Sequence, residues 1–297
     1  MPAFSRVPVM STRSSIASLA LAMTLLVCGS RTTAGAVPKP IALVPFTQNG
    51  TLIALTVRVN ASSKPLRFTL DSGASRCVLD SHTARVLGLH VHDRGRGHGA
   101  GTGTFAYALI SHLMFAVGDA VFRAPDTYAI DLANTGTQRP EDGLIGFDFF
   151  TKYVVRIDYR KRLLTLYDPH TYHYSGSGSV LPILLRRRVP YITVPIKVQG
   201  RSPELRTLLV DSGSEDAVDD AIIARSTAPK RTVGAGVGLG ARYSALLGPI
   251  QTVRFGRFLV KDIQGVSSGV SIVGSAVLRR FTVIFDYAHK SMVFEQE

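Results

Sequence analysis

The sequence is poor in cysteine and in long apolar runs, and both shortages narrow the class of protein. Only Cys28 and Cys77 occur in 297 residues. If the leader described below is removed, Cys77 alone remains, and a single cysteine cannot form an internal disulfide. The apolar run at residues 16–27 is shorter than the roughly 20 apolar residues that a membrane-spanning helix needs. We therefore expect a protein stabilised by packing.

Recognised metal-binding and nucleic-acid-binding patterns are also missing. Four potential ligands cluster beside a glycine-rich stretch: His90, His92, Asp93 and His98. Their spacing matches no familiar Cys/His metal motif, so exposed polar residues are the better interpretation. The densest basic runs, 161–162 and 186–188, have neither interleaved aromatics nor a nucleic-acid-binding module around them. We expect no metal, no other cofactor and no nucleic-acid partner.

Positive charge is in excess. The formal net charge is +13, and it stays strongly positive without the three arginines of the leader. Such a balance favours attraction to anionic surfaces, including membrane headgroups, cell-wall polymers and acidic substrates. An electrostatic association with an anionic membrane or cell-wall surface therefore remains open.

The first residues are typical of a secretory signal peptide. Two arginines precede the apolar run at 16–27, and the small residues at 34–36 supply a cleavage site. We predict that residues 1–36 are a signal peptide and that the protein is exported to the periplasm or the extracellular space. A lipoprotein anchored at Cys28 is the weaker alternative.

What the sequence does contain is an internal repeat. An Asp-Ser-Gly triplet ends an apolar run twice, at residues 71–73 and 211–213. An apolar-apolar-glycine segment follows each triplet, at 144–146 and 272–274. An Asp-Tyr pair then stands at the same offset from each glycine: Asp158-Tyr159 and Asp286-Tyr287. Because a duplicated half-domain duplicates more than one motif, the pattern predicts two similar halves.

The repeat places two aspartate carboxylates, Asp71 and Asp211, in similar local sequence. A carboxylate at a strand-to-turn junction is held by the backbone, and the glycine after it lets the chain turn tightly and bring N–H groups towards it. Two carboxylates within about 3 Å cannot both ionise, so one keeps a proton while the other activates water. We predict that Asp71 and Asp211 form such a catalytic pair, with shared pKa values.

The two halves differ just after the triplets. Ala74 follows the first, whereas Ser214 follows the second and could donate a hydrogen bond to Asp211. Glu215 and Asp216 come next and would disfavour a further negative charge if they pointed inward. Our hypothesis is that Asp211 is the more readily ionised member of the pair.

On these motifs the chain resembles the retropepsin-like and pepsin-like aspartic proteases, in the form that carries two lobes in one chain. The resemblance covers nearly all of the sequence after the leader. It implies a mostly β, bilobal fold with closed β-barrel lobes and an internal duplication. It also implies catalytic roles for Asp71 and Asp211, with the two catalytic loops supported by Ser72, Gly73, Ser212, Gly213 and Ser214.

The expected layout follows from the strand and turn signals. We predict an N-terminal lobe at 37–170, a linker at 171–180 and a C-terminal lobe at 181–297. Short alternating runs rich in Val, Ile, Phe and Tyr favour strands. Helical signals are limited to residues 81–87, which Gly88 would end, and to a possible counterpart at 219–225.

Two glycine-rich stretches, 95–100 and 236–241, fit a loose dinucleotide-binding pattern. Neither clearly follows a buried parallel strand and opens a helix, so that reading is disfavoured. At the same place the aspartic proteases carry a hairpin, and in two-lobed members the first becomes a flap over the substrate. The resemblance thus makes Gly101, Gly103 and Tyr107 flap candidates.

The function predicted from the sequence is that of an exported aspartic endopeptidase acting on a peptide or protein substrate. It would be a monomer whose two halves form an intramolecular pseudo-dimer. Two alternatives remain open. The first is a catalytically weak or inactive fold kept as a peptide-binding or cell-surface module, and the second is a protease active only as a dimer through its first lobe.

Overall fold

Alternating burial explains why most of the described chain forms strands. The structure is a computed structural model that describes residues 38–99, 104–133, 141–235 and 243–296. Along many strands buried and solvent-facing residues alternate, as expected when one face of a sheet covers a core. Val37–Glu297 forms one compact unit. No helix among the described residues is long and apolar enough to cross a membrane.

The first half forms an eight-stranded sheet in the order β2-β3-β4-β9-β5-β8-β7-β6. Strand β3 also pairs with β7, which curls the sheet into a closed barrel. Its strands are β2 (Thr47–Asn49), β3 (Leu52–Val59), β4 (Leu66–Leu70), β5 (Val78–Asp80), β6 (His92–His98), β7 (Thr104–Val117), β8 (Ala120–Ile130) and β9 (Gly143–Ile145).

The second half repeats this arrangement in the order β13-β14-β15-β20-β16-β19-β18-β17, with β14 also pairing with β18. Its strands are β13 (Leu184–Arg186), β14 (Val189–Lys197), β15 (Glu204–Asp211), β16 (Val218–Asp219), β17 (Arg231–Ala235), β18 (Tyr243–Phe255), β19 (Phe258–Ser267) and β20 (Ile272–Gly274). The predicted mostly β, bilobal fold with closed barrels is confirmed.

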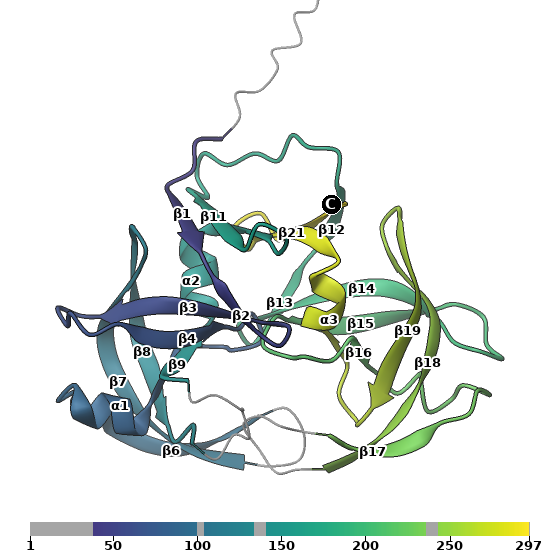
Figure 1. Cartoon of the computed structure of the whole chain (residues 1–297), viewed down its shortest axis with the longest axis horizontal. Helices are drawn as coiled ribbons and strands as arrows, with labels where there is room; N and C mark the ends of the chain where they lie inside the picture. The colour runs from purple at the N-terminus through teal and green to yellow at the C-terminus, as the bar shows by residue number, and fades with distance from the viewer. Residues whose placement is uncertain (1–37, 100–103, 134–140, 236–242, 297) are drawn as a thin grey trace, which may run out of the picture. The chain divides into compact units, whose positions relative to one another are not determined.

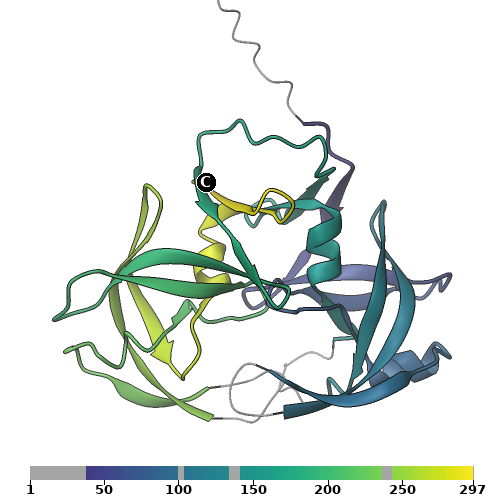
Figure 2. The same ribbon diagram turned by 180° about the vertical axis from the view of Figure 1, so that it is seen from behind.

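A third, six-stranded sheet takes three strands from each half. Its order is β1-β11-β10-β21-β22-β12, so that β10 and β21 meet at its centre. Figure 1, and Figure 2 from behind, show strands of both ends of the colour scale in it. Its strands are β1 (Ala42–Pro45), β10 (Val154–Asp158), β11 (Leu163–Tyr167), β12 (Ser179–Pro182), β21 (Phe281–Asp286) and β22 (Ser291–Gln296). The lobe boundary at 171–180 stays a prediction.

Three short helices complete the described chain: α1 (Ser81–Val86), α2 (Phe147–Lys152) and α3 (Ser275–Leu278). The Asp80 carboxylate caps α1 by accepting the N–H groups of His82 and Thr83. Gly88 follows with φ +66°, so the helix predicted at 81–87 is confirmed within one residue.

The helix expected at 219–225 is wrong. This segment forms successive turns in which the N–H groups of Ile223 and Arg225 each bond a carbonyl three residues earlier. The Asp220 carboxylate accepts the Ile222 N–H and is also bound by the Arg206 guanidinium and the Ser271 hydroxyl, and these bonds hold the turns against the sheet.

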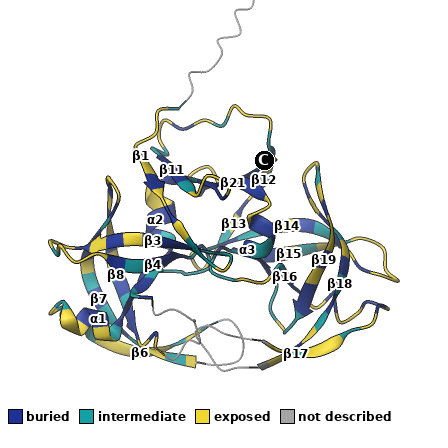
Figure 3. Cartoon of the chain, viewed as in Figure 1, coloured by how far each residue is buried: buried dark blue, intermediate teal, exposed yellow. Residues whose placement is uncertain are grey.

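Aromatic side chains join the two halves in one core. Phe150 of α2 packs edge-on against Phe285 of β21, with ring centroids 5.0 Å apart, and stacks on Tyr287 at 5.4 Å. All three side chains are buried, and Figure 3 shows buried residues running through the strands of both halves. Such contacts add about 0.5–1.5 kcal/mol each beyond the area they bury.

One glycine of the first barrel leaves no room for a side chain. A Cβ atom at Gly143 would lie 2.2 Å from the Val78 carbonyl oxygen, and the Phe68 ring is equally close. We expect Gly143→Ala to destabilise the protein by about 3 kcal/mol, measured by urea unfolding, because backbone and a buried ring must both move. Gly234→Ala is the matched control in a strand with open space, and it should change stability by less than about 0.5 kcal/mol. Equal effects of the two substitutions would contradict this account.

Candidate active site

Asp71 and Asp211 are placed by the same local structure in each half. Strand β4 ends just before Asp71, and β15 ends at Asp211. Each strand pairs in parallel with an apolar strand, β9 or β20, and the Asp71 N–H donates to the Ile145 carbonyl at 2.9 Å. The carboxylates therefore stand at strand ends fixed by a neighbouring buried strand.

The glycines after β9 and within β20 are required by close backbone approach. A Cβ atom at Gly146 would lie 2.5 Å from the Arg76 carbonyl oxygen, and one at Gly274 would lie 2.3 Å from the Asp216 carbonyl oxygen. Real Cβ atoms do not come so near to backbone oxygen. The repeated apolar-apolar-glycine segment is thus explained by the loop that carries each aspartate.

Four reciprocal hydrogen bonds join the two loops across the halves. The Ser72 N–H donates to the Ser212 hydroxyl at 2.9 Å, and the Ser212 N–H donates to the Ser72 hydroxyl at 3.0 Å. The two hydroxyls in turn donate to the carbonyls of Val210 and Leu70, at 2.7 and 2.8 Å. Both serines are buried, so these bonds form without competition from water. We call this set the serine lock.

The serine lock brings the two carboxyl groups together. A Cβ atom at Gly73 would lie 2.7 Å from the Asp211 carboxyl carbon, and one at Gly213 would lie 2.5 Å from that of Asp71. Each carboxyl group therefore rests against the glycine of the opposite loop. The N–H groups of Gly73 and Gly213 also donate to their own loop's aspartate, at 2.8 and 2.9 Å.

The two carboxyl groups differ in acidity. Burial raises the pKa of Asp71 well above its ordinary value, and the charge of Asp211 raises it further. Burial also raises the pKa of Asp211, but the Gly213 N–H, the hydrogen bond from Asp71 and the Ser214 N–H oppose this. We assign the shared proton to Asp71, which donates it to an ionised Asp211. This direction agrees with the hypothesis drawn from the sequence.

The surroundings of Asp211 differ in detail from that hypothesis. The Ser214 hydroxyl accepts the Asp216 N–H at 3.3 Å, so the group of Ser214 that favours an ionised Asp211 is its backbone N–H. Asp216 is exposed, and its charge raises the pKa of Asp211. Glu215 is also exposed and accepts the N–H of Thr51 from the β2–β3 hairpin at 3.3 Å.

The flap candidates are only partly described. Gly101 and Gly103 lie outside the described residues. Tyr107 lies on β7 in the hairpin with β6, half-buried, with its ring centroid 4.6 Å from that of Tyr128. The next described element after β6 is the antiparallel strand β7, which argues against the dinucleotide pattern at 95–100.

Among the histidines near β6, His92 forms ordinary polar contacts. The His92 ring nitrogens lie 3.0 Å from an Asp93 carboxylate oxygen and 2.8 Å from the Ser111 hydroxyl. Within the described ranges, no group of three or more His, Cys, Asp or Glu side chains is arranged to hold a metal ion. Cys77 is buried without a disulfide, as a small core residue.

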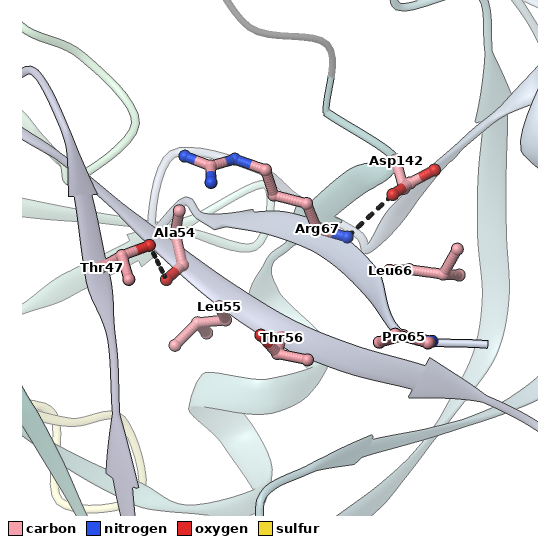
Figure 4. Close-up of a pocket in the computed structure, with 8 residues that line it drawn as sticks. All are labelled: Thr47, Ala54, Leu55, Thr56, Pro65, Leu66, Arg67 and Asp142. Carbon is pink, nitrogen blue, oxygen red and sulfur yellow. Dashed lines mark hydrogen bonds between the residues drawn. The ribbon is translucent and has the colours of Figure 1, made fainter. Parts of the chain in front are cut away.

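A cavity of about 220 Å³ lies elsewhere in the first half, and Figure 4 shows it. It contains neither carboxylate of the pair. The Arg67 N–H donates to the Asp142 carboxylate at 2.8 Å there, and the Arg67 guanidinium pairs with the buried Glu141. These bonds tie β4 to the segment before β9 and thus support the strand that leads to Asp71. The lining residues are Thr47, Ala54, Leu55, Thr56, Pro65, Leu66, Arg67 and Asp142.

Sequence reasoning missed two groups near the pair. The Tyr287 hydroxyl is buried without a hydrogen-bond partner in the described chain, and its pKa is raised by burial and then by the charges of Asp71 and Asp211. The Ser275 hydroxyl donates to the Ser214 carbonyl at 2.6 Å and contacts the Thr51 hydroxyl. The Asp-Tyr repeat was the available signal for Tyr287, but spacing alone does not say which residues a side chain faces.

Comparison with known proteins gives a family match over part of the chain. Residues 55–149 match a family model described as aspartyl protease. The matched segment contains the first triplet, with Asp71, and the Gly146 segment, but not the second triplet. The match supports an aspartic protease family and aspartic protease activity in general. No curated protein matches the chain.

The serine lock predicts a large cost for removing either hydroxyl. Ser72→Ala leaves the Ser212 N–H and the Val210 carbonyl unpaired in the interior, so we expect a loss of about 2–4 kcal/mol in guanidinium unfolding. Ser72→Thr keeps the hydroxyl and should recover most of the stability. Thr193→Ala removes one hydroxyl from an exposed pair with Thr207 and should cost less than about 0.5 kcal/mol. A similar cost for Ser72→Ala and Thr193→Ala would contradict the lock.

The raised pKa of Asp71 predicts a pH-dependent stability difference. Because the folded state holds the Asp71 proton more tightly than the unfolded chain, the wild-type protein loses stability as pH rises from the ordinary aspartate pKa through the raised one. Asp71→Asn does not titrate, so it should be more stable than wild type at pH 7 and lose that advantage at pH 3. Asp119→Asn, at an exposed carboxylate, is the control in thermal unfolding scans. A constant difference across the pH range would overturn the assignment.

Proposed function

We propose that the chain is an exported aspartic endopeptidase that hydrolyses peptide bonds with Asp71 and Asp211. The observation that carries the proposal is the approach of two carboxyl groups from two similar loops, each resting against the other loop's glycine. The serine lock makes this approach rigid, and rigid placement of reacting groups is a large source of catalysis. The family match to residues 55–149 supports the same class of reaction.

The chemistry follows from the unequal acidity of the pair. Ionised Asp211 accepts a proton from a water molecule as the water oxygen attacks the carbonyl carbon of the peptide. Asp71 donates its proton to the carbonyl oxygen, which gives a neutral tetrahedral intermediate. The C–N bond then breaks as the nitrogen takes up the proton held by Asp211, and a hydroxyl proton of the intermediate returns to Asp71. Water is consumed, and both carboxyl groups recover their first state.

An extended peptide is the substrate that suits this setting. The β6–β7 hairpin belongs to the barrel that carries Asp71, and hairpin edges offer backbone groups for strand-like pairing with a bound peptide. The leader at 1–36 supports export to the periplasm or the extracellular space. A monomer is the working form in this proposal, because the serine lock joins residues of one chain.

A peptide-binding module with little turnover is the second candidate. The observation that favours it is the exposed pair Glu215 and Asp216 beside the second loop, since the Asp216 charge opposes ionisation of Asp211. A protein that only binds peptides would still use the residues around the two aspartates. The two candidates separate on cleavage rather than on binding.

Cleavage of a diverse peptide library by the purified protein from pH 3 to pH 8 tests the proposal. Asp71→Asn and Asp211→Asn should each lower cleavage by about 10²–10⁴-fold, the range typical of lost acid–base catalysis. Asp119→Asn, at an exposed carboxylate, should leave cleavage unchanged. Activity should fall at high pH, where Asp71 loses its proton, and at low pH, where Asp211 gains one.

Titration with a peptide analogue of the tetrahedral intermediate distinguishes the remaining alternatives. One analogue bound per chain supports the intramolecular pair, and one per two chains supports a dimer through the first lobe. Peptide binding without any cleavage in the wild-type protein would replace the protease proposal with the binding module.

A further inference from the structure

Three arginines converge on a second pocket, away from the residues of the serine lock. The pocket has a volume of about 320 Å³ and is lined by Gln48, Tyr159, Arg160, Arg279 and Arg280. None of these residues belongs to either aspartate loop. We propose that this pocket binds the phosphate group of a small anion or a lipid headgroup, and we call it the arginine pocket.

Pairing at the centre of the six-stranded sheet brings the arginines together. Strands β10 and β21 run antiparallel, with Asp158 opposite Thr282. The residues just after β10, Tyr159 and Arg160, therefore lie at the same end of the sheet as Arg280, just before β21. The Phe46 ring packs against Tyr159 with centroids 6.2 Å apart, which brings the neighbouring β2 and its Gln48 to the same place.

The charges in the arginine pocket are of one sign. Its lining residues include no carboxylate, and the described residues contain no ion pair to Arg279 or Arg280. The charges of the neighbouring, exposed Arg279 and Arg280 repel each other, and a bound anion would offset that repulsion. The planar guanidinium offers paired N–H donors that match the oxygens of phosphate, which favours phosphate over a simple halide.

Tyr159 is the buried member of the pocket lining. Tyr159 is only 4 % exposed, and its hydroxyl has no hydrogen-bond partner within the described ranges. A buried hydroxyl without a partner costs about 1–3 kcal/mol.

The two halves differ at this place, so the fold alone does not require the arginines. Counted from Gly146 and Gly274, the positions equivalent to Tyr159, Arg160, Arg279 and Arg280 are Tyr287, Ala288, Thr151 and Lys152. One cation thus replaces three where the backbone is otherwise repeated. The cluster is a feature of one side of the molecule, and the opposite side provides a control with the same architecture.

Titration of the purified protein with inorganic phosphate at constant ionic strength tests the arginine pocket. We compare wild type with Arg279→Gln/Arg280→Gln, following heat of binding and thermal stabilisation. The control Lys152→Gln/Arg187→Gln removes the same charge at exposed positions outside the pocket. The pocket variant should bind phosphate at least tenfold more weakly, and the control should match wild type. Both arginines are exposed, so the fold should persist, and Arg280→Gln alone is a milder second variant.

Vesicles separate the two sources of phosphate. Sedimentation with phosphatidylglycerol vesicles, against phosphatidylcholine vesicles, reports headgroup binding. Binding of phosphate or of phosphatidylglycerol that the pocket variant loses and the control keeps supports the proposal and identifies the source. Equal binding by wild type, pocket variant and control, or equal losses in both variants, would overturn it as an effect of overall charge, as would absence of binding to either ligand. Peptide cleavage is not a readout here, so failure of the protease proposal leaves this result unaffected.

Discussion

The placement of the two aspartates depends on the serine lock. Each serine both accepts the other's N–H and donates to a carbonyl of the opposite strand end, so three polar groups on each side find these partners only when the halves meet. An approach of two carboxyl groups is unfavourable by itself, because burial and mutual repulsion both resist charge. The lock and the parallel pairing of β4 with β9 and of β15 with β20 hold that approach in place.

Chemical inequality arises around this near-symmetric centre. The backbone amides are similar on both sides, since each glycine N–H bonds its own aspartate. The pair is unequal all the same, because the hydrogen bond between the two carboxyl groups raises the pKa of Asp71 and lowers that of Asp211. A single proton can therefore have a preferred position although the supporting backbone is duplicated. The arginine pocket is likewise a feature of one side of the molecule, although the backbone around it is repeated on the other side.

Much of the fold was predictable because it depends on local sequence motifs, most of which occur in both halves. The triplets, the glycine segments and the α1 boundary at Gly88 each follow from a backbone requirement that the sequence reveals. Features that depend on distant contacts were not predictable. A helix at 219–225 was expected as the counterpart of 81–87, but the bonds that Arg206 and the Ser271 hydroxyl donate to Asp220 hold turns there. The pairing of β10 with β21 could be seen only in the structure. The same holds for the bond from the Ser214 N–H to Asp211.

The six-stranded sheet holds the two halves together by strand pairing as well as by the covalent chain between them. Its central pair is β10 with β21, one strand from each half, and the aromatic contact of Phe150 with Phe285 lies beside it. Of residues 168–178, between β11 and β12, Tyr172 is buried in this interface, in a cluster with Val154 of β10 and Ile284 of β21. A chain cut in that segment would consist of two fragments, each with one aspartate and with three strands of the six-stranded sheet. Association of the fragments would restore the sheet and the paired carboxyl groups together.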